Sequence, residues 1–177
     1  MYGQRRFTPA VNPVKWYFVI ILRDHPIMPV YRCHCPCETN QFEISGSPMT
    51  RFFCHCTICQ EKYQAPYADV VLFPLASLTL PEDHSISFGQ YKRFGAIDRG
   101  ICTDCHQPVM AKAGEGNKGL AFIAAHNVAN PASLPAPSMH VFYGTRVADV
   151  EDSLPKYRHY LSSQFAFLKL LLTRSRT

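Results

Sequence analysis

The stretch Phe53-Cys54-His55-Cys56-Thr57-Ile58-Cys59 places three thiols close together in the chain. In an extended strand, residues two apart point to the same face, so Cys54 and Cys56 are expected to direct their sulfur atoms to one point. A turn would then bring Cys59 to the same point. Three thiolates around a tetrahedral zinc ion leave its fourth position open, which is the pattern of a catalytic zinc site.

This central group also admits a second interpretation, in which a fourth ligand closes the site. His34, His55 or a spare cysteine would supply that ligand, and a closed site would only stabilise the fold. His55 is the weakest of these candidates, because its position between two cysteines on a strand directs its ring to the opposite face.

The other cysteines form two further tight groups. Cys102 and Cys105 make a C-x-x-C knuckle, and Cys33, Cys35 and Cys37 alternate along the chain. Two of these three would complete a four-cysteine structural site with the knuckle, which leaves one cysteine spare. Such spacings are too short for an ordinary disulfide framework and suit a shared metal. We therefore expect two Zn²⁺ ions per chain and a reducing, cytoplasmic location.

Composition and charge limit the remaining classes. The 177 residues are enough for one domain with a hydrophobic core, and 14 prolines against 9 glycines favour short elements joined by turns. The net charge of +5 is modest, much of it lies near the two ends, and no run of five basic residues occurs. A nucleic-acid partner is therefore not expected.

The pattern of apolar residues and turn residues predicts a mainly β protein. Thr57–Lys62 is the one short helical turn expected in the middle of the chain, with Thr57 as its cap. The continuous apolar run Ala68–Phe73 predicts a buried strand. The full set of expected strands covers residues 30–37, 41–44, 50–56, 68–73, 77–80, 86–88, 90–94, 100–105, 107–111, 120–124 and 140–142.

The two ends of the chain differ from the middle. Residues 1–27 are expected to form a loosely ordered extension. The apolar run Trp16–Leu22 is not expected to be a signal peptide, because it is short and Arg23 and Asp24 follow it directly. That run is also too short to span a bilayer. Lys156–Leu172 predicts a helix packed on the sheet through an apolar face, formed by Tyr157, Tyr160, Leu161, Phe165, Leu168 and Leu172.

A helix lying on a membrane surface is the alternative for this last segment, because Lys169 and Arg174 accompany the apolar residues. Packing on the sheet is the preferred interpretation, and no membrane partner is expected.

Several of these motifs resemble the family of glutathione-dependent formaldehyde-activating enzymes, a zinc-binding family with a small β fold. The resemblance covers residues 29–160 and is most specific at the Cys54–Cys59 motif. Glu38 and His106 depart from it, because the family usually has glycine at these two positions. The matching features are Cys35-Pro36-Cys37 followed by Gln41-Phe42-Glu43, the Cys54–Cys59 motif, Ile101-Cys102-Thr103-Asp104-Cys105, and weaker matches at Asn130-Pro131, His140-Val141 and Leu154-Pro155-Lys156-Tyr157.

The resemblance implies a role for each cysteine. Cys35, Cys37, Cys102 and Cys105 would hold a structural zinc ion, and Cys54, Cys56 and Cys59 would hold the catalytic zinc ion. Cys33 stays a possible ligand, because the repeated Cys-His-Cys pattern would pair it with Cys35 instead.

The resemblance also implies an activity and a domain layout. The chain would be a carbon–sulfur lyase that adds a small thiol such as glutathione to a small aldehyde such as formaldehyde. A non-catalytic zinc-binding interaction module is the alternative. The layout would be an extension at 1–27, a tent-like, zinc-stapled β domain at 28–160 and a C-terminal helix or tail at 161–177. The candidate partners for substrate carboxylates are Arg51, Lys62, Arg93 and Arg99.

Overall fold

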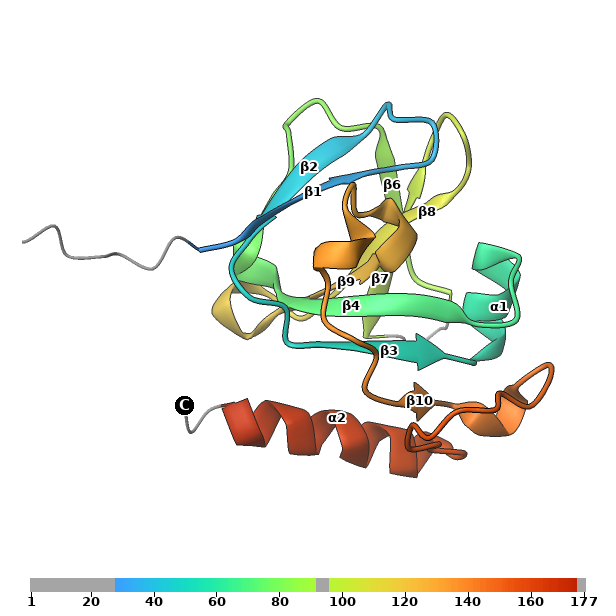
Figure 1. Cartoon of the computed structure of the whole chain (residues 1–177). Coiled ribbons are helices and arrows are strands. Elements are labelled where there is room, and N and C mark those ends of the chain that lie inside the picture. The colour runs from blue at the N-terminus through green and yellow to red at the C-terminus, as the bar shows by residue number, and fades with distance from the viewer. Residues whose placement is uncertain (1–27, 92–95, 175–177) are drawn as a thin grey trace, which may run out of the picture.

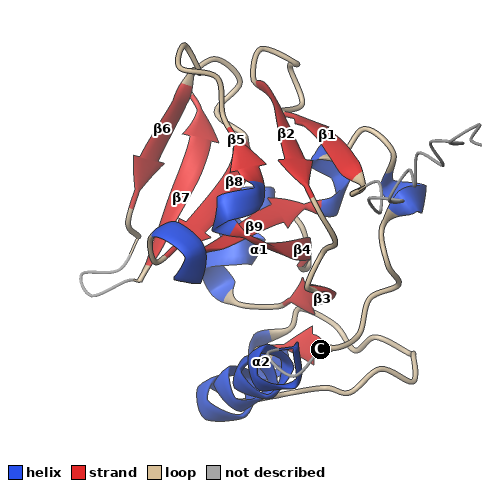
Figure 2. Cartoon of the chain, turned by 90° about the vertical axis from the view of Figure 1, so that its left-hand side faces the viewer, coloured by secondary structure: helices blue, strands red, loops and turns tan. Residues whose placement is uncertain are grey.

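The computed structural model describes residues 28–91 and 96–174, which form two β-sheets with a helix at the C-terminal end (Figures 1 and 2). This confirms the expected fold class, a mainly β domain with a C-terminal helix. One sheet has the order β1-β2-β5 and the other the order β10-β3-β4-β9-β8-β7-β6. All strand pairs are antiparallel except β10 with β3.

Most strands overlap the expected ranges. The smaller sheet contains β1 (Val30–His34), β2 (Gln41–Ser45) and β5 (Leu78–Thr79). The larger sheet contains β3 (Thr50–Cys54), β4 (Ala68–Pro74), β6 (Ile86–Gly89), β7 (Ile97–Cys102), β8 (Pro108–Ala113), β9 (Leu120–Ala124) and β10 (His140–Val141). The helices are α1 (Thr57–Tyr63), α2 (Tyr160–Arg174) and short 3-10 turns at Leu75–Ser77, Gly116–Lys118, Ala125–Asn127, Pro131–Ser133 and Tyr143–Thr145.

The strand β4 contributes to hydrophobic clusters on both faces of the larger sheet. Val71 and Phe73 pack with Ile44 of the smaller sheet, whereas Val70 and Leu72 point to the side that α2 covers. This alternation follows from the pleat of the strand. Because both faces are covered, the strand is apolar at nearly every position, as the continuous run in the sequence predicted.

Four expected strands differ from the structure. The strand expected at 50–56 ends at Cys54, and the one expected at 100–105 lies at Ile97–Cys102. The segment expected at 30–37 leaves the sheet after His34, so Cys35 and Cys37 lie in a turn, and the alternation of cysteine side chains ends there. The strand expected at 90–94 is not seen at Gln90 and Tyr91, and its remaining residues lie outside the described part of the chain. The N-terminal extension at 1–27 also lies outside it, and the division into three segments stays a prediction.

The expected packing face is wrong within α2, although Tyr157, just before the helix, does pack against the core. Leu161 and Phe165 are exposed, as are Tyr160, Leu168 and Leu172, whereas Ser163 and Ala166 are buried against the sheet. The Ser163 hydroxyl accepts a hydrogen bond from the Phe142 N–H at 2.9 Å. Phe167 and Leu170 also pack on this side of the helix, against the cluster around Phe52. Regular spacing alone does not show which side of an apolar helix will pack. No helix in the described residues has the length and apolar character needed to cross a membrane.

Candidate metal sites

The first cysteine cluster joins the turn after β1 to the turn after β7. The Sγ atoms of Cys35, Cys37, Cys102 and Cys105 all lie within 4.8 Å of one another. The Cys35–Cys37 and Cys37–Cys102 Sγ distances are 3.3 and 3.7 Å. Four sulfurs at about 2.3 Å from a tetrahedral zinc ion would be about 3.8 Å apart. The four thiols therefore fit one tetrahedral metal ion.

Each of the two turns ends in a left-handed residue. Glu38 has a φ angle of +61° and His106 one of +57°. The N–H of Glu38 donates to the Cys35 carbonyl at 2.9 Å, and the N–H of His106 donates to the Cys102 carbonyl at 3.0 Å. These hydrogen bonds close both turns and set the cysteine pairs side by side.

Asn40 supports this cluster, and the sequence offered no signal for it. Its buried side-chain amide donates to the Sγ of Cys102 at 3.1 Å, and its backbone N–H donates to the Sγ of Cys35 at 3.3 Å. Its side-chain oxygen accepts from the backbone N–H of Ser85 at 2.8 Å. Donors aimed at sulfur stabilise the thiolate form, which is the form that binds a metal.

Cys33 lies apart from this cluster. It is only 2% exposed and packs in the hydrophobic core with Phe42 and Ile44. Burial raises the pKa of its thiol to about 12. The structure thus brings Cys35 and Cys37, rather than Cys33, to the C-x-x-C knuckle, and Cys33 is the spare cysteine.

The second cluster lies where β3 meets α1. The Sγ atoms of Cys54, Cys56 and Cys59 all lie within 4.8 Å of one another, with 3.4 Å between Cys54 and Cys59. Cys56, rather than the expected Thr57, is the N-cap of α1, because its Sγ accepts the backbone N–H of Cys59. The cap therefore holds two of the three thiols in place.

No fourth ligand joins these three thiols among the described residues. The ring of His55 turns away and its Nε2 lies 2.8 Å from Nδ1 of His140. The His34 Nδ1 lies 3.1 Å from the carbonyl oxygen of Cys35, beside the other cluster. The candidates for closing the site are therefore directed elsewhere, and the second cluster offers three protein ligands.

Each of the three thiols changes the pKa of the other two. Hydrogen bonds from Cys54 and Cys59 lower the pKa of Cys56 far below its usual range, and the positive charge of Arg99 adds to this. The hydrogen bond to Cys56 in turn raises the pKa of Cys54, which is also buried. Three adjacent thiols of this kind form a stable trithiolate only with a cation to balance their charge, so the donor set fits a zinc ion.

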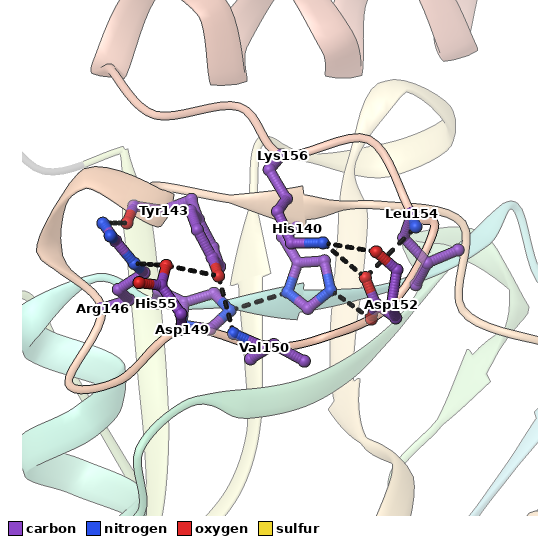
Figure 3. A network of polar contacts seen from close by, with 9 residues as sticks. All are labelled: His55, His140, Tyr143, Arg146, Asp149, Val150, Asp152, Leu154 and Lys156. Atoms are coloured by element: carbon purple, nitrogen blue, oxygen red, sulfur yellow. Dashed lines mark hydrogen bonds and ion pairs between the residues drawn. The ribbon is translucent and has the colours of Figure 1, made fainter.

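A chain of polar side chains runs from the buried His55 and His140 to the more exposed Asp152 and Lys156 (Figure 3). His140 stands between His55 and the carboxylate of Asp152, with its Nε2 2.8 Å from Asp152 Oδ2. Lys156 donates to the other oxygen of that carboxylate at 2.6 Å. His55 is also held through its carbonyl, which accepts the Thr145 hydroxyl at 2.8 Å. The residue between two of the thiols is thus fixed from several sides.

The tautomers in this chain follow from the carboxylate. Because Asp152 accepts from Nε2–H of His140, the Nδ1 of a neutral His140 accepts from Nε2–H of His55. The Nδ1 of His55 is then a buried acceptor, and it has no hydrogen-bond partner. Burial lowers the pKa of His55 to about 4, which keeps its ring neutral.

The four basic residues proposed to bind substrate carboxylates differ in what they contact. Arg51 is paired with the Asp69 carboxylate at 2.6 Å, so it is committed to β3 and β4. Lys62 pairs with the exposed Glu61 carboxylate at 2.9 Å and lies 4.3 Å from the centre of the Tyr91 ring. The Arg99 guanidinium lies over the same ring at 5.9 Å. The structure therefore brings Lys62 and Arg99 together, and Arg99 acts electrostatically on Cys56 and Cys59. Arg93 lies outside the described residues.

A mainly β domain with one four-thiol cluster and one three-thiol cluster defines a class of protein built to hold metal, consistent with zinc. The sequence model of the glutathione-dependent formaldehyde-activating enzymes matches residues 30–145, and the chain belongs to this family. The match spans both cysteine clusters. No curated protein matches the chain.

Proposed function

We propose that this chain is a zinc-dependent carbon–sulfur lyase that joins a small thiol to a small aldehyde, as glutathione and formaldehyde are joined in S-(hydroxymethyl)glutathione. In this reaction the thiol sulfur bonds to the aldehyde carbon, and the proton lost by the thiol ends on the hydroxyl oxygen. The reverse reaction breaks the same carbon–sulfur bond. Family membership supports the general kind of activity.

The observation that carries this proposal is the difference between the two clusters. Four thiols converge in the first and three in the second. Four protein ligands suit a structural ion, whereas three leave a position for a substrate. A zinc ion held by Cys54, Cys56 and Cys59 would supply a site at which a bound thiol loses its proton near neutral pH.

The protein's own residues would bind and orient the substrate. Lys62 and Arg99 flank the Tyr91 ring, and Arg99 is close enough to affect the Cys56 thiol electrostatically. Glutathione carries two carboxylates, so these two cations are the proposed partners for them. His55 and its partners would keep the Cys54–Cys56 loop in one conformation.

The test measures zinc content and glutathione binding for the wild type, Cys56→Ser and Cys33→Ser. Cys33→Ser is the matched control, because Cys33 lies outside both clusters. We expect two zinc ions per chain in the wild type and the control, one in Cys56→Ser, and loss of glutathione binding in Cys56→Ser alone. Circular dichroism establishes that each variant is folded.

Two outcomes would contradict the proposal. One is a wild type that holds a single zinc ion. The other is a wild type with both ions that does not bind glutathione, which would favour the alternative of a zinc-binding interaction module. The cytoplasmic location and the absence of a nucleic-acid partner stay predictions.

A further inference from the structure

The C-terminal helix α2 presents an apolar stripe to solvent. Leu161, Phe165, Leu168 and Leu172 follow one another at intervals of four, three and four residues, which places them on one side of a helix. They are 67%, 67%, 48% and 59% exposed. The buried Ser163 lies on the other side of the helix, so this stripe, Leu161 to Leu172, points away from the protein body.

The position of α2 leaves the stripe open to a flat surface. The helix runs along the outer edge of the molecule beyond β10, and no other described element lies on its far side (Figures 1 and 2). Tyr160 adds an aromatic side chain, 64% exposed, at the start of the helix. Aromatic and leucine side chains on one outward face are typical of helices that lie in a membrane interface.

The charge of this region has one sign. From Ser153 to the end, the chain contains no Asp or Glu. Such a segment is attracted to a surface of negative charge. Its basic residues other than Lys156, which pairs with Asp152, are Arg158, Lys169, Arg174 and Arg176.

A second copy of the chain fits these observations less well than an anionic bilayer does. Pairing α2 with its own copy would bring two tails of positive charge together without a carboxylate between them. The stripe is also short, since a stable protein interface uses about 20–30 residues on each side. A bilayer requires only that the apolar side chains insert and the charges meet lipid phosphates.

We propose that α2 attaches the protein reversibly to an anionic membrane surface. The helix lies parallel to the bilayer plane with Leu161, Phe165, Leu168 and Leu172 between the headgroups, and the β domain remains in the water. This replaces the expectation of no membrane partner, which assigned these same residues to packing on the sheet. The proposal does not depend on the proposed enzymatic activity.

The test is co-sedimentation of the whole chain with vesicles of phosphatidylcholine alone and with added phosphatidylserine. We expect at least about tenfold stronger binding to the anionic vesicles at low salt, decreasing as salt rises. The double variant Phe165→Gln/Leu168→Gln should bind about tenfold or more weakly, because it removes half of the inserted stripe. Val147→Gln is the matched control, since Val147 is 68% exposed outside α2, and it should bind as the wild type does.

Three results would overturn the proposal, given that zinc content and circular dichroism show both variants to be folded. The first is no vesicle binding by the wild type, or equal binding to neutral and anionic vesicles. The second is unchanged binding by the double variant. The third is a wild-type dimer that Phe165→Gln/Leu168→Gln converts to a monomer without any vesicle binding, which would assign the stripe to a second copy.

Discussion

Glu38 and His106 hold left-handed backbone conformations, with φ angles of +61° and +57°. Glu38 directly follows Cys37, and His106 directly follows Cys105. The family usually has glycine at both positions. A side chain with a Cβ atom is disfavoured in this region, and glycine is not. The two departures from the family pattern therefore keep the geometry of the turns at an energetic cost.

Replacing these residues by glycine should stabilise the protein. We expect Glu38→Gly and His106→Gly each to raise the free energy of unfolding by about 0.5–1 kcal/mol, because the relief of backbone strain exceeds the added entropy of the unfolded chain. Chemical unfolding of the zinc-loaded protein measures the effect. Glu115→Gly is the control, since Glu115 has an ordinary φ of −134°. Equal destabilisation by all three variants would contradict this account.

Asp152 is the exposed end of the polar chain that runs through His140 to His55. Hydrogen bonds from Lys156 and then His140 lower the pKa of Asp152 from 3.8 to about 2. A carboxylate with a lowered pKa in the folded state contributes stability above its unfolded pKa, and this contribution is lost as the pH falls through the folded value. The contribution of Asp152 is therefore complete above about pH 4 and decreases towards pH 2.

Asp152→Asn should test this dependence. The variant is expected to be less stable than the wild type near neutral pH, and the difference should shrink as the pH falls below 3.8. Urea unfolding of both proteins across this pH range gives the comparison. Glu151→Gln is the control for removing an exposed neighbouring carboxylate. A difference between Asp152→Asn and wild type that does not change with pH would show that Asp152 contributes through shape rather than charge.

At the scale of elements, α2 is held where its leading segment meets the 3-10 turn at Tyr143–Thr145. The N–H of Tyr143 donates to the Tyr157 carbonyl at 2.8 Å, and the N–H of Gly144 donates to the Arg158 carbonyl at 2.9 Å. A Cβ atom on Gly144 would lie 2.6 Å from that same Arg158 oxygen. Gly144 is therefore required for the close approach of the two segments.

Gly144→Ala should loosen this contact. Because the obstructing atom belongs to the backbone, we expect a loss of about 1–3 kcal/mol in the free energy of unfolding. Thermal unfolding and hydrogen exchange at α2 measure the change. Gly89→Ala is the control, because a Cβ atom there meets nothing within 4 Å. Equal effects of the two substitutions would mean that general flexibility, not this contact, determines the result.

At the scale of the whole molecule, the first cysteine cluster connects the two sheets. Cys35 and Cys37 follow β1 of the smaller sheet, whereas Cys102 ends β7 of the larger sheet and Cys105 lies in the turn after it. The second cluster is local, because it spans only the junction of β3 and α1. Metal at the first cluster would therefore contribute more to global stability than metal at the second.

Cys102→Ser and Cys56→Ser should separate the two contributions. We expect Cys102→Ser to lower the melting temperature by more than about 10 °C. The free energy of binding a metal ion that links the two sheets is part of the free energy of folding, and this variant loses it. Cys56→Ser should lower it much less. Calorimetry with metal analysis gives both values, and adding a chelator to the wild type should reproduce the Cys102→Ser result. Similar losses in the two variants would contradict the division of roles.

Features that depend on residues close together in the chain could be predicted from the sequence. The spacing of Cys54, Cys56 and Cys59 brings their sulfurs together through a strand end and one helical turn. The run at Ala68–Phe73 and the segment Leu120–Ala124 were predicted as strands, because composition and alternation over a few residues reflect the environment of a strand.

Features that depend on contacts between residues far apart in the chain became known from the tertiary structure. The choice of Cys37 over Cys33 follows from where β1 ends and from the position of Cys102. The contact between His55 and His140 joins residues 85 positions apart. The outward stripe on α2 exists because Ser163, Ala166, Phe167 and Leu170, on the opposite side of the helix, pack on the rest of the protein. Local patterns show which residues share a face, but packing across the whole molecule determines what that face meets.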